Sequence, residues 1–313
     1  MTGLGHGSAN LGNLYTAMTD EQAWEVLSAA WEGGIRYFDT APHYGLGLSE
    51  RRLGGFLATK PRDDYVVSTK VGRLLRPSPE TADRYDDKHQ FAVAACMRRV
   101  WDVSRDGVRR SLDESLERLG LDVVDVLYVH DPEEHDLDAA LRTAIPALVD
   151  LREQGVVRAI GLGSKSTQAL LAGARTGALD LLMVAGRLTL LDQSALLEVA
   201  PECRARRIGI VAAAVFNSGL LSSASPGAGT RYEYGEVPPS VLDLTRRIER
   251  VCRRHRVELP VAALQFPLLE PAVRCVVAGA AERRHVTENL TRLEVAVPHD
   301  LWDELSAEGL IRR

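Results

Sequence analysis

The strongest constraint on the fold is an alternation of short apolar runs, rich in β-branched residues, with longer stretches that follow helical periodicity. Because each run has the length of a strand and is followed by a helical pattern, the order predicts repeated strand–helix units and therefore a parallel sheet. The predicted strands are Ile35–Phe38, Tyr65–Thr69, Val124–Val129, Val157–Gly161, Leu181–Val184, Ile208–Ala212, Ala263–Phe266 and Cys275–Val277.

Three of the predicted helices have well-marked ends. Thr19 can cap the first, and Gln22, three residues further on, completes a capping box. Gly33 ends that helix, because glycine readily adopts the backbone conformation that terminates a helix. A second helix is predicted at 106–119 and a third at 141–154, each followed by a glycine.

Eight strand–helix units can form either a closed barrel or an open, doubly wound sheet. The open sheet should show a G-x-G-x-x-G turn directly after its first strand. Here the first predicted strand is followed by Asp39–Pro42, and Gly3, Gly5 and Gly7 come before it. The sequence therefore predicts an α/β fold of the (β/α)8 TIM barrel type, formed by residues 1–313 as a single domain.

Two segments are too long to be simple connections between a strand and a helix. Residues 72–106 are predicted to form a partly helical loop over the active face of the barrel. Residues 221–239, which are rich in Ser, Gly and Pro, form the second insertion. Loops on this face of a barrel commonly carry its functional groups.

Composition and charge narrow the function. The formal net charge of −5 gives no electrostatic reason to expect nucleic acid or an anionic membrane as a partner. No apolar run approaches the roughly 18 residues of a membrane span, and no signal peptide is evident, so we expect a cytoplasmic location. The four cysteines lie far apart without a C-x-x-C, which favours buried thiols in a reducing compartment. A small molecule is the expected partner, and no oligomeric state is indicated.

Three ionisable residues stand at the ends of successive predicted strands: Asp39, Lys70 and His130. In a barrel such residues converge on one mouth, and Tyr44 follows Asp39 by one short turn. A tyrosine with a pKa of about 10 is a weak acid or base near neutrality, but a nearby ammonium favours the phenolate. We expect Asp39 to orient Lys70, and His130 to hydrogen-bond the reacting oxygen. General acid–base catalysis by such a group is worth about 10²–10⁴-fold.

Each of these residues also has a purely structural interpretation. Alone, Asp39 would cap a turn, Lys70 would extend to solvent, and His130 would be a core histidine. Their joint position at strand ends, beside a tyrosine, favours function. A metal site at His130 and His135 is not expected, because the proline between them disfavours a helical ligand pair and the spacing matches no zinc motif. The intervening carboxylates are interpreted as a surface loop near the substrate mouth.

Longer strings resemble the signature of the aldo-keto reductase family: Gly34–Gly45 continuing to Ser49–Gly54, then Arg110–Gly120 followed by Asp125 and His130. The resemblance covers nearly the whole chain and implies that Asp39, Tyr44, Lys70 and His130 form a catalytic tetrad. It also implies a nicotinamide cofactor that exchanges a hydride with a carbonyl or hemiacetal carbon.

Further strings resemble the sugar-oxidising, aldose 1-dehydrogenase branch of that family: Trp101–Gly107, His130–His135, Ala185–Gln193 and Phe216–Gly219. Members of this branch oxidise the C1 hemiacetal of a pyranose of the L-fucose or D-arabinose type to a lactone. Tyr44, as the phenolate, would take the proton of the anomeric hydroxyl while a hydride leaves C1. Trp101 and His43 are the candidate substrate contacts, since sugars stack on aromatic faces, although a core role suits Trp101 equally well.

Three alternative functions stay open. Pyridoxal 4-dehydrogenases share much of the pattern and attack a similar cyclic hemiacetal. An NADPH-dependent reductase of aldehydes and ketones would use the same tetrad in the opposite direction. A cofactor-sensing regulatory subunit belongs to another class of function, and the intact tetrad speaks against it.

The resemblance also implies the cofactor contacts. Phe216 takes the place of a tyrosine that stacks on the nicotinamide ring. Lys165 stands where relatives usually have an asparagine that holds the carboxamide, which weakens that contact and puts a cation near the ring. The remaining contacts are Ser164 near the carboxamide, Asn217, Ser218 and Leu220 along the pyrophosphate, and Gly279, Ala280, Glu288 and Asn289 at the adenosine end.

The choice of dinucleotide depends on residues 281–285. Glu282 would accept a hydrogen bond from a free ribose hydroxyl and would repel a 2′-phosphate, which favours NAD. Arg283 and Arg284 argue for NADP if either folds over the adenosine, and for NAD if both face solvent. The sequence therefore predicts NAD(P), with NAD favoured.

Overall fold

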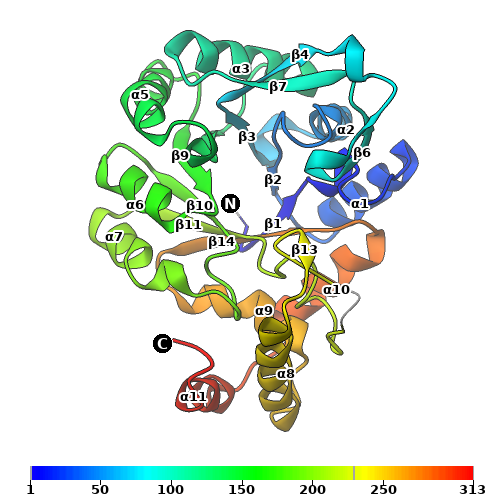
Figure 1. Cartoon of the computed structure of the whole chain (residues 1–313), viewed down its shortest axis with the longest axis vertical. Helices are drawn as coiled ribbons and strands as arrows, with labels where there is room; N and C mark the ends of the chain where they lie inside the picture. Colours follow the sequence, from blue (N-terminus) through cyan, green and yellow to red (C-terminus); the bar gives the residue numbers. More distant parts are fainter. Residues whose placement is uncertain (1, 228–229, 313) are drawn as a thin grey trace.

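A computed structural model describes residues 2–227 and 230–312 of the chain. Its centre is a closed barrel of eight parallel strands, and helices form a ring around it (Figure 1). Strand β1 pairs with both β2 and β14, which closes the barrel. In ring order the strands are β1 (Leu4–Gly7), β2 (Tyr37–Asp39), β3 (Val66–Val71), β8 (Val126–His130), β9 (Ala159–Ser164), β10 (Leu181–Ala185), β11 (Gly209–Ala213) and β14 (Val273–Gly279).

The predicted (β/α)8 barrel is confirmed, and seven of the eight predicted runs overlap barrel strands. The prediction for Ala263–Phe266 is wrong, because this apolar run lies in α9 (Leu259–Gln265) and the 3-10 turn after it. Periodicity alone cannot separate a short buried helix from a strand. The missing strand is β1, whose two glycines weaken its strand signal.

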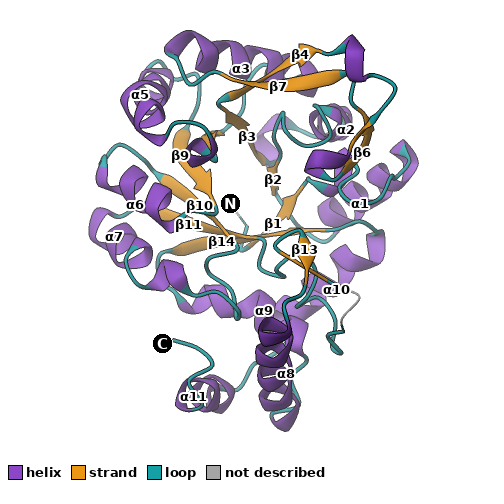
Figure 2. Ribbon diagram, viewed as in Figure 1, coloured by secondary structure: helices purple, strands orange, loops and turns teal. Residues whose placement is uncertain are grey.

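The helices cover the outside of the barrel (Figure 2). They are α1 (Asp20–Glu32), α2 (Leu48–Leu57), α3 (Arg105–Leu119), α4 (Leu137–Ala139), α5 (Ile145–Glu153), α6 (Thr167–Arg175), α7 (Val199–Arg206), α8 (Pro239–Arg254), α9, α10 (Arg283–Glu294) and α11 (His299–Ala307). The predicted capping box is present, with Thr19 and Gln22 each accepting from the other's backbone nitrogen. No helix in the described part of the chain is long and apolar enough to cross a membrane.

The first insertion differs from its prediction. Residues 72–106 are mainly two antiparallel strand pairs, β4 (Arg73–Pro77) with β7 (Met97–Trp101) and β5 (Tyr85–Asp86) with β6 (Phe91–Ala94), joined by short 3-10 turns. The strands are short, and β4 and β7 each carry two arginines, so the segment lacks the sustained apolar alternation that identifies a strand in a sequence. Phe91 packs 6.3 Å from the Tyr44 ring, which places this insertion beside the predicted site.

The second insertion contains another small hairpin. Strands β12 (Arg231–Tyr232) and β13 (Gly235–Glu236) pair antiparallel, while residues 228–229 of the predicted segment 221–239 lie outside the described residues. The amide of Tyr234 donates to Ser218 Oγ at 3.1 Å, and Gln90 Nε2 donates to the Tyr234 carbonyl at 2.8 Å. The two insertions therefore touch each other.

Hydrophobic residues fill both the barrel and the layer between barrel and helices. The barrel interior contains a core of its own: Tyr37, Val126, Tyr128, Leu181, Met183, Val211, Cys275 and Val277. The expectation of buried thiols is confirmed for Cys203, Cys252 and Cys275 and is wrong for Cys96, which is exposed in the first insertion.

Candidate active site

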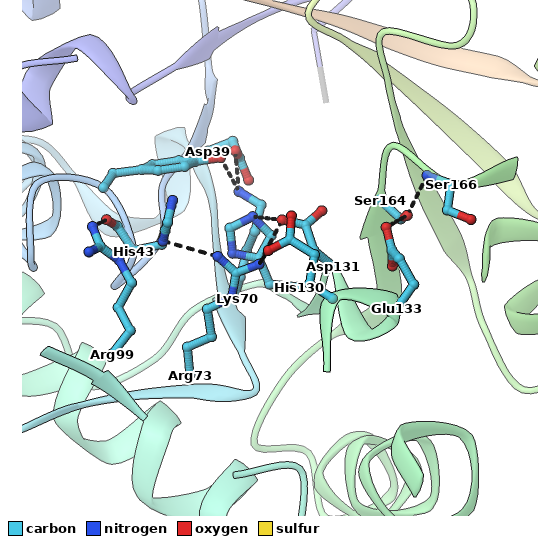
Figure 3. Close-up of polar contacts among 12 residues, drawn as sticks. Asp39, His43, Lys70, Arg73, Arg99, His130, Asp131, Glu133, Ser164 and Ser166 are labelled. Atoms are coloured by element: carbon cyan, nitrogen blue, oxygen red, sulfur yellow. Dashed lines mark hydrogen bonds and ion pairs between the residues drawn. The ribbon is translucent and has the colours of Figure 1, made fainter. Parts of the chain in front are cut away.

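The structure brings the predicted tetrad together at one end of the barrel. Asp39 and His130 are the last residues of β2 and β8, and Lys70 lies near the end of β3. Lys70 Nζ donates to Asp39 Oδ2 at 2.6 Å and to Tyr44 Oη at 3.2 Å. Figure 3 shows the Asp39 carboxylate pointing at the Lys70 ammonium, with His130 beside them. A third hydrogen bond, to the carbonyl of Thr40 at 2.9 Å, completes the coordination of the ammonium.

Burial and charge set the protonation states of the lysine and the tyrosine. Burial alone would lower the pKa of Lys70, but Asp39 and Tyr44 outweigh it and the pKa is raised, so the ammonium stays charged. Burial raises the pKa of Tyr44, the Lys70 charge and hydrogen bond lower it, and Asp39 raises it. The net pKa of Tyr44 is above its ordinary value of 10, so the phenol is protonated at neutral pH in the ligand-free protein.

The two histidines of the site are neutral. Burial, followed by the charges of Arg73 and Lys70, holds the pKa of His130 well below its usual range. The pKa of His43 is lowered well below 6.5, first by burial and then by Arg99 and Arg73. The His130 ring stands 5.9 Å from the Tyr44 ring at 89°, so a neutral imidazole faces the same space as the phenol.

A buried glutamate that the sequence analysis did not single out supports the tetrad from behind. Glu50 on α2 is fully buried and accepts from Arg118 Nε at 2.6 Å and from Thr69 Oγ1 at 2.7 Å. Thr69 directly precedes Lys70 on β3. These two hydrogen bonds of Glu50 therefore connect α2 and α3 to β3, the strand that carries Lys70. Glu50 belongs to the string Ser49–Gly54, and that string was the only available signal for it.

The expected loop of surface carboxylates after His130 is present only in part: Glu134 is exposed, whereas Asp131 is largely buried. The Asp131 side chain is 15% exposed, forms an ion pair with Arg73 at 2.9 Å, and lies 3.4 Å from His130 Nε2. Burial raises its pKa to about 6, against the opposing effect of Arg73. Glu133 accepts a hydrogen bond from Ser164 Oγ, as Figure 3 shows. No group of three or more potential ligands is arranged to hold a metal among residues 2–227 and 230–312.

Trp101 is not part of the cavity wall. Its ring stacks on His135 with centroids 5.3 Å apart, and the Arg73 guanidinium lies 4.3 Å above it. The other predicted substrate contact, His43, hydrogen-bonds Arg73 through Nδ1 at 3.0 Å and also does not line the cavity. Tyr15 and Tyr234 do line it, with ring centroids 6.3 Å apart, and neither belongs to a motif that would have singled it out.

A cavity of about 740 Å³ extends from the tetrad across the ends of β9, β11 and β14. This volume lies within the range of small-molecule and cofactor sites. Most of the predicted cofactor contacts line it: Ser164, Phe216, Asn217, Ser218, Gly279, Ala280, Glu288 and Asn289.

Three predicted cofactor contacts do not reach the cavity. Leu220 is fully buried in the core, and the Lys165 ammonium lies 4.9 Å over the Tyr234 ring. Glu282 is exposed and accepts from Arg284 Nε at 2.7 Å. Arg284 does line the cavity, as does Arg292.

The cavity wall also contains polar atoms that require a ligand or water. The Asn217 side chain is buried, yet both its nitrogen and its oxygen have no hydrogen-bond partner. Asn217 and Ser218 adopt the left-handed backbone conformation, with φ of 46° and 59°, which side chains other than glycine rarely take. Unpaired buried amides and backbone strain of this kind are typical of ligand sites. The residues therefore fit an extended polar group such as a dinucleotide.

Comparison with known proteins identifies the family to which the chain belongs. Residues 3–307 match the sequence model of the aldo/keto reductase family. The chain is 54% identical to a D-threo-aldose 1-dehydrogenase from a Pseudomonas species, over 98% of this chain and 94% of that protein. It is 36% identical to a pyridoxal 4-dehydrogenase from Microbacterium luteolum, over 99% of this chain and 95% of that protein.

A solved structure, the holo form of an aldo-keto reductase from Bacillus halodurans, has the same fold. The TM-score is 0.76 at 23% identity, over 99% of this chain and 92% of that one. The chain belongs to the aldo/keto reductase family, and it is a nicotinamide-dependent oxidoreductase.

Proposed function

We propose that the chain oxidises the C1 hemiacetal of an aldose to a lactone, with Tyr44 as the acid–base group. The observation that carries the proposal is the 3.2 Å contact between Tyr44 Oη and the buried Lys70 ammonium, at the edge of the cavity. The 54% identical relative named D-threo-aldose 1-dehydrogenase supports the substrate class. The geometry alone would serve any carbonyl or hemiacetal substrate.

The tetrad residues have separate roles in this reaction. Tyr44 Oη accepts the proton of the anomeric hydroxyl, and the Lys70 ammonium stabilises the phenolate that does so. Neutral His130 donates a hydrogen bond to the same substrate oxygen, and Asp39 keeps Lys70 charged and oriented. When bound, the oxidised dinucleotide supplies the hydride acceptor, and its positive ring favours the Tyr44 phenolate.

The substrate end of the cavity suits a polyhydroxylated ring. The Asp131 carboxylate is an acceptor for sugar hydroxyls within the cavity, and Tyr15 and Tyr234 offer aromatic faces for the ring carbons. Pyridoxal, the second candidate, is favoured by the 36% identical relative named for it. It is a single aromatic ring with fewer hydroxyls, so it would use less of the Asp131 carboxylate.

We propose NAD as the preferred dinucleotide. Arg284 lines the cavity, which by itself would favour a 2′-phosphate, but its guanidinium already donates to Glu282. Arg283 pairs with Glu32 at 2.9 Å and does not line the cavity. A phosphate would have to displace Glu282 from Arg284, whereas a free ribose hydroxyl would not.

We also propose a cytoplasmic location. The four cysteines are all unpaired, and three of them are buried as thiols, which suits a reducing compartment.

One assay tests the activity. The protein is incubated with NAD or NADP and L-fucose, D-arabinose, L-galactose, pyridoxal or simple alcohols, and reduced nicotinamide is followed by its absorbance. We expect turnover of a sugar hemiacetal with NAD, and a loss of about 10²–10⁴-fold on Tyr44→Phe. Tyr65→Phe, which removes a hydroxyl from a buried tyrosine outside the cavity, is the matched control. Full turnover by Tyr44→Phe, or a preference for simple alcohols over every hemiacetal, would overturn the proposal.

A further inference from the structure

A layer of buried hydroxyl groups lies directly beneath the catalytic residues, inside the barrel. Tyr37, Ser68 and Tyr128 each stand two positions before the tetrad residue of their strand, on β2, β3 and β8 respectively. Side chains two apart on a strand point to the same face, so all three point into the barrel. Each of the three is fully buried, and none lines the cavity.

The three hydroxyls form one continuous chain that ends on the catalytic aspartate. Tyr128 Oη lies 3.2 Å from Tyr37 Oη, and Tyr37 Oη lies 3.0 Å from Ser68 Oγ. Ser68 Oγ donates to Asp39 Oδ1 at 2.7 Å, while the other carboxylate oxygen accepts from Lys70. The chain thus reaches from the barrel core to the ammonium that contacts Tyr44.

The donors in this chain can point in only one direction. The Asp39 carboxylate only accepts, so Ser68 must give its single proton to it. Ser68 can then accept from Tyr37 but cannot donate to it, and Tyr37 in turn must accept from Tyr128. Burial raises the pKa of Tyr37 and of Tyr128, so both phenols keep their protons across the working pH range. Three aligned dipoles therefore point at one carboxylate, and each bond strengthens the next.

The two phenol rings of this chain pack against barrel positions that carry glycine in place of a larger residue. A Cβ at Gly5 would lie 2.7 Å from Tyr37 Cδ1, and a Cβ at Gly161 would lie 2.6 Å from Tyr128 Cε1. Apolar side chains would fill the same volume without the cost of burying hydroxyl groups. Packing therefore accounts for the rings of Tyr37 and Tyr128 but not for their oxygens.

We propose that Ser68, Tyr37 and Tyr128 are positioning residues: their hydrogen-bonded chain fixes Asp39 Oδ1, so that Oδ2 stays directed at the Lys70 ammonium. The role of the chain in turnover rests on the proposed acid–base function of Tyr44. None of the three touches a reacting atom, so each acts only through Asp39.

The consequence for pH dependence has a definite sign. Without the Ser68 donor, no aligned hydroxyl dipole offsets the charge of Asp39, and this charge raises the pKa of Tyr44 more strongly. The pH at which oxidation reaches half its maximal turnover then moves upward. Four other titratable groups face Tyr44, and these variants leave them unchanged. The rings of His130 and His43 pack against the Tyr44 ring, and Asp131 and Tyr234 interact with Tyr44 electrostatically.

The test compares pH profiles of kcat for Ser68→Ala, Tyr37→Phe and Tyr128→Phe, with Tyr65→Phe as the control. We expect an upward shift of about one unit for Ser68→Ala, a smaller one for Tyr37→Phe and the smallest for Tyr128→Phe. The double variant Ser68→Ala/Tyr37→Phe should match Ser68→Ala alone, because the chain is already cut. The KM for the dinucleotide should not change.

A second readout keeps the test independent of the substrate. The side-chain ammonium signal of Lys70 in nitrogen-labelled protein should be present in the wild type and in Tyr65→Phe, and weakened in Ser68→Ala. The kinetic arm can use any alcohol or carbonyl that the wild type turns over, so a wrong aldose assignment leaves it intact. Superimposable pH profiles together with an unchanged Lys70 signal in folded Ser68→Ala and Tyr37→Phe would overturn the proposal.

Discussion

Replacing either of two adjacent glycines on α2 by alanine should change the unfolding free energy, but in opposite directions. A Cβ at Gly54 would lie 2.0 Å from the carbonyl oxygen of Leu119 at the end of α3, whereas a Cβ at Gly55 meets nothing within 4 Å. Gly54 is buried and Gly55 is exposed, and both have ordinary helical backbone angles. The pair therefore separates the helical preference for alanine from the close contact between two helices.

The magnitudes follow from these two environments. Gly55→Ala gains only the helix preference of alanine, about 1 kcal/mol of stability. Gly54→Ala gains the same helix preference. However, its Cβ would lie 2.0 Å from the Leu119 oxygen, and ordinary contacts begin near 3.4 Å, so α2 and α3 must move apart by more than 1 Å. Overpacking of this kind costs about 3 kcal/mol or more, because the clashing atom is backbone. The two variants should therefore differ by about 3 kcal/mol in unfolding free energy.

Denaturation by guanidinium, followed by helical circular dichroism, measures both variants against the wild type. We expect a lower midpoint for Gly54→Ala and a higher one for Gly55→Ala, with equal slopes. The Glu50–Arg118 ion pair bridges the same helices, so Gly54→Ala should also reduce turnover while Gly55→Ala does not. A Gly54→Ala midpoint at or above that of the wild type would refute the account of how α2 and α3 approach.

Three further changes have expected outcomes. Burial raises the pKa of Asp131 from 3.8 to about 6, so its charge destabilises the fold increasingly as pH rises through this window. The unfolding free energy of Asp131→Asn should therefore rise relative to that of the wild type by up to about 3 kcal/mol between pH 4 and pH 7. Urea titrations at each pH would measure this difference. Glu282→Ala frees Arg284 and should lower the KM for NADP relative to NAD, and steady-state kinetics with both dinucleotides would check this. Thr19→Ala removes the capping box of α1 and should lower the unfolding free energy by about 1 kcal/mol, with a corresponding fall in Tm.

Much of the fold follows from local rules that the sequence displays directly. The capping box at Thr19 and the glycine after α3 define helix ends because they act through neighbouring backbone atoms. The proximity of Asp39, Lys70 and His130 was predictable because residues at the ends of parallel strands share one face of a barrel.

The features that sequence analysis missed depend on contacts between distant segments. Strand β1 is held by pairing with β2 and β14 and not by its own composition, and Gly5 leaves the space that the Tyr37 ring fills. Asp131 is buried because Arg73, from the first insertion, reaches across to it. Trp101 was a plausible sugar platform by residue type, but its ring packs against Arg73 and His135 and does not line the cavity.

The placement of functional groups around the ring divides the barrel into two arcs. The residues proposed to handle the proton lie on or next to β2, β3 and β8, whereas the proposed dinucleotide contacts follow β9, β11 and β14 on the other arc. The Glu133–Ser164 hydrogen bond joins the arcs where β8 meets β9, whereas the residues proposed for the adenosine end follow β14, at the far end of the second arc. An engineer could therefore change coenzyme choice on one arc and retain the chemistry of the other, and natural divergence could have done the same.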